Sequence, residues 1–99
     1  MPEPKRIARV SSSTLYREVQ GEAVLLHLDS GEYFGLDEIA TRIWQLIVEK
    51  GDLAEVEAAM LAEFDVDPAV LQNDLRRMVD DLAAKRLIDI ESAAPPHTR

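Results

Sequence analysis

The segment GEYFGLDEIATRIWQLI, residues 31–47, is the most informative part of the sequence because the spacing of its apolar side chains changes within it. Residues 32–36 (EYFGL) are aromatic and apolar and follow a turn signal at residues 29–31 (DSG), which predicts a short β-strand. From Asp37, a suitable N-cap, apolar side chains recur at helical spacing. The buried stripe expected for this helix is Ile39, Ile43, Leu46 and Ile47, widened by Ala40 and Trp44. The segment therefore predicts a strand that runs directly into a helix.

Two further strands are expected upstream, at residues 14–20 and 23–28, with a turn at residues 21–22 between them. Period-two alternation in the second of these strands puts three apolar side chains on one face, namely Val24, Leu26 and Leu28. The opposite face carries Leu25 and His27, so it is only partly polar. Together with residues 32–36, these strands form a three-stranded antiparallel meander, one face of which needs a cover.

Two further helices are expected downstream. Lys50-Gly51 ends the first helix, and Asp52 with Glu55 resembles a capping box that begins the second. Asp67-Pro68 begins a third helix, in which proline occupies the first position. The expected buried stripes are Leu53, Val56, Met60 and Phe64 in the second helix, and Leu71, Leu75, Met78, Val79 and Leu82 in the third. Residues 87–90 form a short apolar segment that leaves the third helix. The predicted class is therefore α+β, with three strands followed by three helices.

Charge and composition divide the chain into a body and two arms. The 99 residues carry 11 Lys and Arg against 19 Asp and Glu, a net charge of −8. Residues 1–13 carry +2 and residues 91–99 carry none, which leaves −10 for residues 14–90. The ends are rich in Pro, Ser and Ala, which predicts a flexible basic N-terminal arm, a single domain at 14–90 and a flexible C-terminal tail. An acidic body disfavours nucleic acid as a partner, because phosphates repel it.

The sequence shows no membrane or export signal. No apolar run approaches the roughly 20 residues of a membrane helix, and the N-terminus lacks the apolar region of a secretory signal. We therefore expect a cytoplasmic protein with no membrane partner.

Side chains for catalysis are scarce. The absence of cysteine excludes disulfides, thiolate metal sites and thiol catalysis, and His27 and His97 lie far apart in the sequence. The carboxylate pairs Asp37-Glu38 and Asp80-Asp81 are explained by a helix cap and a solvated helix face. The sequence contains neither a glycine-rich phosphate loop nor a nucleophile motif. We therefore expect a protein that is not an enzyme and uses no cofactor or metal.

Peptide binding is better supported. If residues 23–28 form the central strand, residues 32–36 form a sheet edge with free N–H and C=O groups beside a helix. Such an edge can accept an extended peptide as an additional strand. The alternative is that Tyr33, Phe34 and Leu36 belong only to the core, and alternation assigns at least half of them to it.

Residues 31–47 resemble the Y-[YF]-x-L-N-x-x-[AG]-x-x-[IL]-W-x-L-[LI] pattern of the PqqD-like family. The matching residues are Tyr33, Phe34, Leu36, Ala40, Ile43, Trp44, Leu46 and Ile47, and Asp37 stands where the family usually has Asn. Residues 64–66 (FDV) are similar to the family's Y/F-D-V. Asp74-Leu75, Leu82 and Leu87-Ile88 are similar to its D-[VL]…L…G-[LI]-[IL], with Arg86 in place of the usual Gly. The resemblance covers about residues 14–90.

This resemblance implies a winged-helix-like fold and a recognition function. Family members bind the leader of ribosomally synthesised, post-translationally modified peptides, in pyrroloquinoline quinone and lasso-peptide pathways among others. The resemblance implies that the leader of a precursor peptide adds as a fourth strand beside the third, in a groove against the third helix. It also implies delivery to a partner enzyme such as a leader peptidase, a cyclase or a radical-SAM enzyme. Residues 25–36 (LLHLDSGEYFGL) look more like lasso-type and general members than like the pyrroloquinoline quinone protein.

Carried over by position, the predicted peptide-binding residues come from the edge strand and one flank of the third helix. They are Glu32, Tyr33, Phe34, Gly35, Leu36, Asp74, Arg77, Met78, Asp81 and Lys85. The other flank carries Gln72, Arg76 and Ala83, and we favour the first because Asp74 matches the family's acidic position. Our hypothesis is that the acids meet basic residues of the leader, although a solvated helix face explains them equally well.

Three other interpretations remain open from the sequence. The first is a DNA-binding winged helix that uses residues 69–85 as its recognition helix, which the body charge of −10 disfavours. The second is an adaptor for a protein surface unrelated to modified peptides. In addition, a homodimer through the same edge strand is physically compatible with the sequence.

Overall fold

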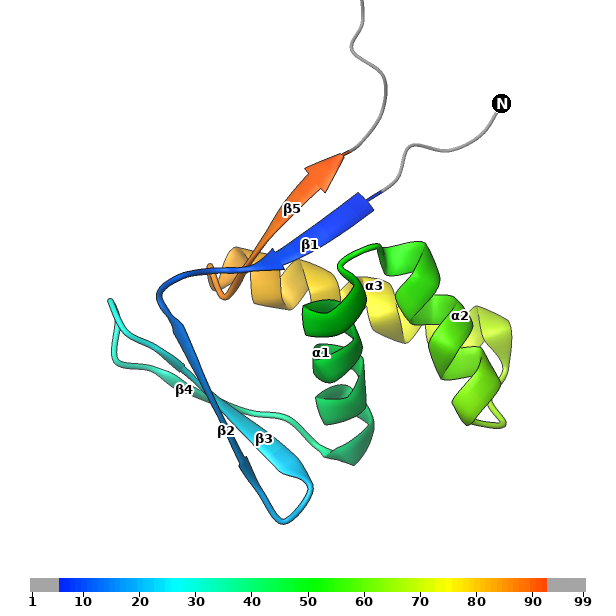
Figure 1. Cartoon of the computed structure of the whole chain (residues 1–99), viewed down its shortest axis with the longest axis horizontal. Helices are drawn as coiled ribbons and strands as arrows, with labels where there is room; N and C mark the ends of the chain where they lie inside the picture. Colours follow the sequence, from blue (N-terminus) through cyan, green and yellow to red (C-terminus); the bar gives the residue numbers. More distant parts are fainter. Residues whose placement is uncertain (1–5, 93–99) are drawn as a thin grey trace, which may run out of the picture.

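The computed structural model describes residues 6–92, and within them the chain forms five strands and three helices (Figure 1). The elements are β1 (Arg6–Val10), β2 (Thr14–Val19), β3 (Glu22–His27), β4 (Tyr33–Gly35), α1 (Glu38–Lys50), α2 (Leu53–Glu63), α3 (Pro68–Ala84) and β5 (Ile88–Ser92). Strands β2, β3 and β4 form an antiparallel sheet with β3 in the centre. The predicted α+β class, with a three-stranded antiparallel sheet followed by three helices, is confirmed.

All three helices begin at the aspartates that the sequence predicts as N-caps. The side chain of Asp37 accepts a hydrogen bond from the backbone N–H of Ala40 at 2.8 Å. Asp52 and Asp67 cap α2 and α3 in a similar way, each accepting from the N–H two residues further on. Each carboxylate satisfies an N–H that has no partner inside its helix. None of the helices within residues 6–92 has the length and apolar character needed to cross a membrane.

Helix α1 packs on the face of the central sheet that carries Leu25 and His27, and not on the more apolar face with Val24, Leu26 and Leu28. Leu25 is fully buried in one core cluster with Trp44. The backbone N–H of Ala23, on the same face as Leu25, donates to the Thr41 hydroxyl of α1 at 2.7 Å. A small residue at Ala23 lets α1 approach this closely, which alternation alone does not reveal. The His27 ring is mostly buried, with Nδ1 at 3.3 Å from the backbone N of Ser30, so this histidine supports the turn.

The predicted arms are wrong where the structure describes them. Residues 6–10 form β1, which pairs antiparallel with β5, so part of each predicted arm belongs to a two-stranded ribbon. Ala8 is buried, and its N–H donates to the carbonyl of Gly51 at 2.8 Å. An ion pair between Arg9 and Glu91 at 3.0 Å spans the ribbon. The pairing joins opposite ends of the chain, so no local sequence pattern predicts it. Residues 1–5 and 93–99 of the predicted arms lie outside the described residues.

Arg86, which stands where the PqqD-like pattern that the sequence resembles has Gly, adopts a left-handed conformation with φ of 63° just after α3. A helix commonly ends on such a residue, and glycine favours it because glycine has no Cβ to clash. The next residue completes the helix end, because the N–H of Leu87 donates to the carbonyl of Leu82 at 2.9 Å. The turn therefore keeps the glycine geometry although arginine occupies it.

Replacing Arg86 by glycine should stabilise the domain by about 1 kcal/mol, because a side chain in the left-handed region costs about that much. Urea unfolding of Arg86→Gly and the parent protein measures the difference. The matched control is Arg76→Gly, an exposed position inside α3, which should destabilise by about 1 kcal/mol. Equal destabilisation by both substitutions would contradict this reading of the turn.

Candidate functional site

Strand β4 is an open edge of the sheet. Phe34 lies opposite Leu25 of β3. The hydrogen bonds from the N–H of Leu36 to the carbonyl of Ala23, and from the N–H of His27 to the carbonyl of Glu32, flank this pair. Bonded and non-bonded positions alternate in an antiparallel pair, so the N–H and C=O groups of Tyr33 and Gly35 point away from β3. Within residues 6–92 no strand pairs with β4 on that side.

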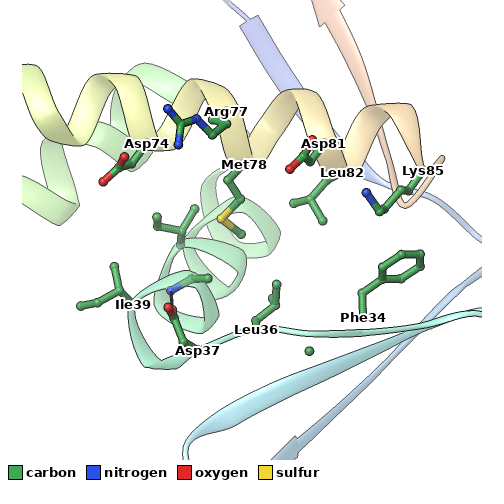
Figure 2. A pocket seen from close by; sticks show the side chains of 13 residues that line it. Phe34, Leu36, Asp37, Ile39, Asp74, Arg77, Met78, Asp81, Leu82 and Lys85 are labelled. Carbon is green, nitrogen blue, oxygen red and sulfur yellow. Dashed lines mark hydrogen bonds between the residues drawn. The ribbon is translucent and has the colours of Figure 1, made fainter.

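A groove runs between β4 and α3, with the start of α1 closing one end (Figure 2). Its volume is about 560 Å³. Three side chains from three elements form its apolar floor: Leu36 after β4, Ile43 of α1 and Leu82 of α3. Ile43 and Leu82 are buried, whereas Leu36 is half-buried and packs against the core. Met78 of α3 points into the groove from above this floor (Figure 2). The groove therefore has an apolar bottom and one open strand edge as a wall.

Charged side chains of alternating sign follow the α3 wall of the groove. In chain order they are Asp74, Arg77, Asp81 and Lys85 (Figure 2). They are exposed, and none of the ion pairs within the described part of the chain involves them. The Lys85 ammonium lies 5.5 Å from the centre of the Phe34 ring, which places a cation–π contact at one end of the groove. The other three charges are open to a ligand that enters the groove.

The structure brings most of the predicted site residues together. Those that line the groove are Phe34, Gly35, Leu36, Asp74, Arg77, Met78, Asp81 and Lys85. Glu32 and Tyr33 do not line it, because Tyr33 points to the other face of the sheet and is 71% exposed. The flank of α3 that was favoured because Asp74 matches the family's acidic position is the flank that faces the groove.

Several groove residues were assigned to other roles by the sequence pattern. Ile39, expected in the buried stripe of the first helix, is 42% exposed and lines the groove. Asp37, assigned only a capping role, and the expected stripe residues Ala40, Ile43 and Leu82 line it as well. The signal that could have identified Ile39 is its place in the first turn of α1, directly after the edge strand. At this end of the helix no other element of residues 6–92 packs over the apolar stripe.

Within residues 6–92 no three His, Asp or Glu side chains are arranged to hold a metal ion. The groove combines the outward-facing backbone groups of Tyr33 and Gly35, an apolar floor and a row of charged side chains on α3. These features suit an extended polypeptide, because its backbone can pair with β4 while alternate side chains enter the groove.

The fold and the groove define a winged-helix-like α+β binding domain with an open strand edge. The chain belongs to the PqqD family, because the family model described as coenzyme PQQ synthesis protein D (PqqD) matches residues 22–88, more than half of its length. Curated proteins yielded no match.

Two solved structures are similar to this chain. The first, "TbiB1 in Complex with the TbiA(beta) Leader Peptide", has 38% sequence identity and a TM-score of 0.77, and the match covers 82% of this chain and 94% of the other. The second, "Lasso peptide synthetase B1 complexed with the leader peptide", has a TM-score of 0.75 over 83% of this chain and 96% of the other. Its 23% identity makes it evidence for the fold alone.

Proposed function

We propose that this protein binds the leader of a ribosomally synthesised precursor peptide by β-strand addition and presents the peptide to a modifying or processing enzyme. The observation that carries the proposal is the open edge of β4, where the backbone groups of Tyr33 and Gly35 face outward beside the groove. A peptide strand there would extend the sheet from three strands to four.

Membership of the PqqD family and the likeness to TbiB1 support this function. TbiB1 is 38% identical to this chain, and its solved structure is a complex with a leader peptide. By analogy with that complex, we expect a leader peptide to be the ligand of this chain.

In this proposal each part of the peptide has a counterpart in the groove. The peptide backbone pairs with Tyr33 and Gly35, and an apolar side chain rests on the floor around Leu36. Asp74 and Asp81 meet basic residues of the leader. The exposed position of these acids makes their contribution sensitive to salt.

The chemistry belongs to a second protein in this proposal. A leader peptidase, a cyclase or a radical-SAM enzyme acts on the peptide while this chain holds the leader. The DNA-binding alternative draws no support from the groove side of α3, where Asp74 and Asp81 offset Arg77 and Lys85.

A titration of the ¹⁵N-labelled protein tests the function, with the TbiA(beta) leader peptide as the probe. Amide signals of residues 32–36 and 74–85 should shift and saturate, because these segments form the two walls of the groove. Higher salt should raise the peptide concentration at half-saturation.

A scrambled peptide of the same composition is the control for this titration. Equal shifts with the scrambled peptide, shifts confined to residues 6–10, or no shifts at saturating peptide would each contradict the proposal.

A further inference from the structure

The face of the central sheet that points away from the helices, here called the outer face, exposes large apolar side chains. Tyr33 is 71% exposed and Leu15 is 52% exposed, while Val24 and Leu26 between them are half-buried. A hollow of about 500 Å³ lies at this face, lined by Leu15, Arg17, Val24, Leu26 and Tyr33 of the face itself and bordered by Tyr16 of β2. The outer face is therefore an apolar surface that nothing within residues 6–92 covers.

Gly35 leaves a notch in the β4 border of this surface. It pairs with Val24 across the ladder and lies on the outer face with Tyr33, two residues before it. Its φ is not in the left-handed region, so the backbone does not require glycine here. A Cβ built on Gly35 would meet no atom within 4 Å. Neither conformation nor crowding inside the domain explains the missing side chain.

The notch borders the strand edge that the proposed function uses. A peptide strand paired with β4 points every second side chain to the outer face. A peptide residue beside Gly35 finds no neighbouring side chain on β4 and can reach over the glycine to Val24. Aromatic residues cover an edge glycine in this way in designed sheets.

We propose that the outer-face side chain of the bound peptide beside Gly35 is aromatic or a large aliphatic, and that it covers Gly35 and packs against Val24 and Tyr33. The inference rests on the proposed strand addition and names a residue class in the ligand that the groove does not read. Gly35 is thus a specificity-determining residue through the side chain it lacks.

The test uses a randomised display library of twelve-residue peptides, selected in parallel on the parent protein and on Gly35→Val. Valine suits an edge strand and finds open space at this position, so the variant should remain folded. Peptides selected on the parent should share a large apolar residue at one position. That preference should disappear on Gly35→Val, because the valine side chain fills the notch.

Individual peptides make the result quantitative. Changing the preferred residue to alanine should weaken binding to the parent by about tenfold, the scale expected for burying one large apolar side chain. On Gly35→Val the same change should matter less than about threefold. Val19→Thr, which alters another exposed apolar residue of the outer face, is the matched control and should keep the parent's preference.

Three results would overturn the inference. One is a selected pool without the apolar preference, and another is a preference that survives in Gly35→Val. The third is a dimer of the peptide-free protein in sedimentation that Tyr33→Ser dissociates, since a second copy would then cover the face. Selected peptides that leave the amides of Tyr33 and Gly35 unshifted would contradict the proposed function itself, which separates the two failures.

Discussion

Replacing Gly35 by proline should weaken binding of the leader peptide by roughly 100-fold while the domain stays folded. The Gly35 N–H points away from β3, so proline removes no hydrogen bond of the sheet, and edge strands tolerate proline at such a position. The peptide loses the hydrogen bond that the Gly35 N–H would donate, so one of its own carbonyl groups is left without a partner. The proline ring also occupies the space beside the strand edge. Together these effects cost about 3 kcal/mol.

Isothermal titration of Gly35→Pro with the TbiA(beta) leader peptide measures this loss. Gly35→Ala is the matched control, because alanine keeps the N–H and its methyl group points to the outer face. It should retain affinity within a few-fold of the parent, a difference of less than about 1 kcal/mol. An unchanged affinity in Gly35→Pro would mean that the peptide does not pair with β4.

Replacing Trp44 by alanine should lower the free energy of unfolding by about 3–5 kcal/mol. Trp44 is only 2% exposed, belongs to the core cluster and stacks on Tyr16 of β2, with 6.5 Å between the ring centres. The substitution leaves a cavity where α1 meets the sheet. Because small domains have only about 5–15 kcal/mol of stability, the variant should lose a large share of it.

Urea unfolding followed by far-ultraviolet circular dichroism measures the loss in Trp44→Ala. Val48→Ala, at a 60% exposed position on the same helix, should change stability by less than about 0.5 kcal/mol. A Trp44→Ala protein within 1 kcal/mol of the parent would show that the junction of α1 and the sheet tolerates the cavity, in contrast to the usual cost of such a change.

The helices were predictable because their signals are local. Asp37, Asp52 and Asp67 each lie next to the backbone N–H groups that they cap, so the sequence alone places the helix starts. Helical periodicity divided the exposed part of α3 into two flanks, and the resemblance at Asp74 selected the one that faces the groove. Ile39 was misassigned because periodicity identifies an apolar stripe on a helix but does not show how far along the helix other elements bury that stripe.

The first and last strands escaped prediction for the opposite reason. Strands β1 and β5 pair although they lie near opposite ends of the sequence, and each is short and partly charged. Composition assigned residues 6–10 and 91–92 to solvated arms, and residues 87–90 were expected only as a short apolar exit. Residues 6–10 form a strand only because they pair with β5 and because the Ala8 N–H donates to the carbonyl of Gly51.

The order of the three central strands and the three helices, the helix caps and the position of the edge strand could be read from the sequence, because their signals are local. Tertiary structure decided which face of the sheet is buried, since Leu25 and Val24 are both apolar and only the packing of α1 distinguishes them. It also decided that Tyr33 points away from the groove and that Gly35 leaves a gap on the outer face. Local patterns record which side chains share a face, whereas burial of that face depends on elements that are distant in the chain.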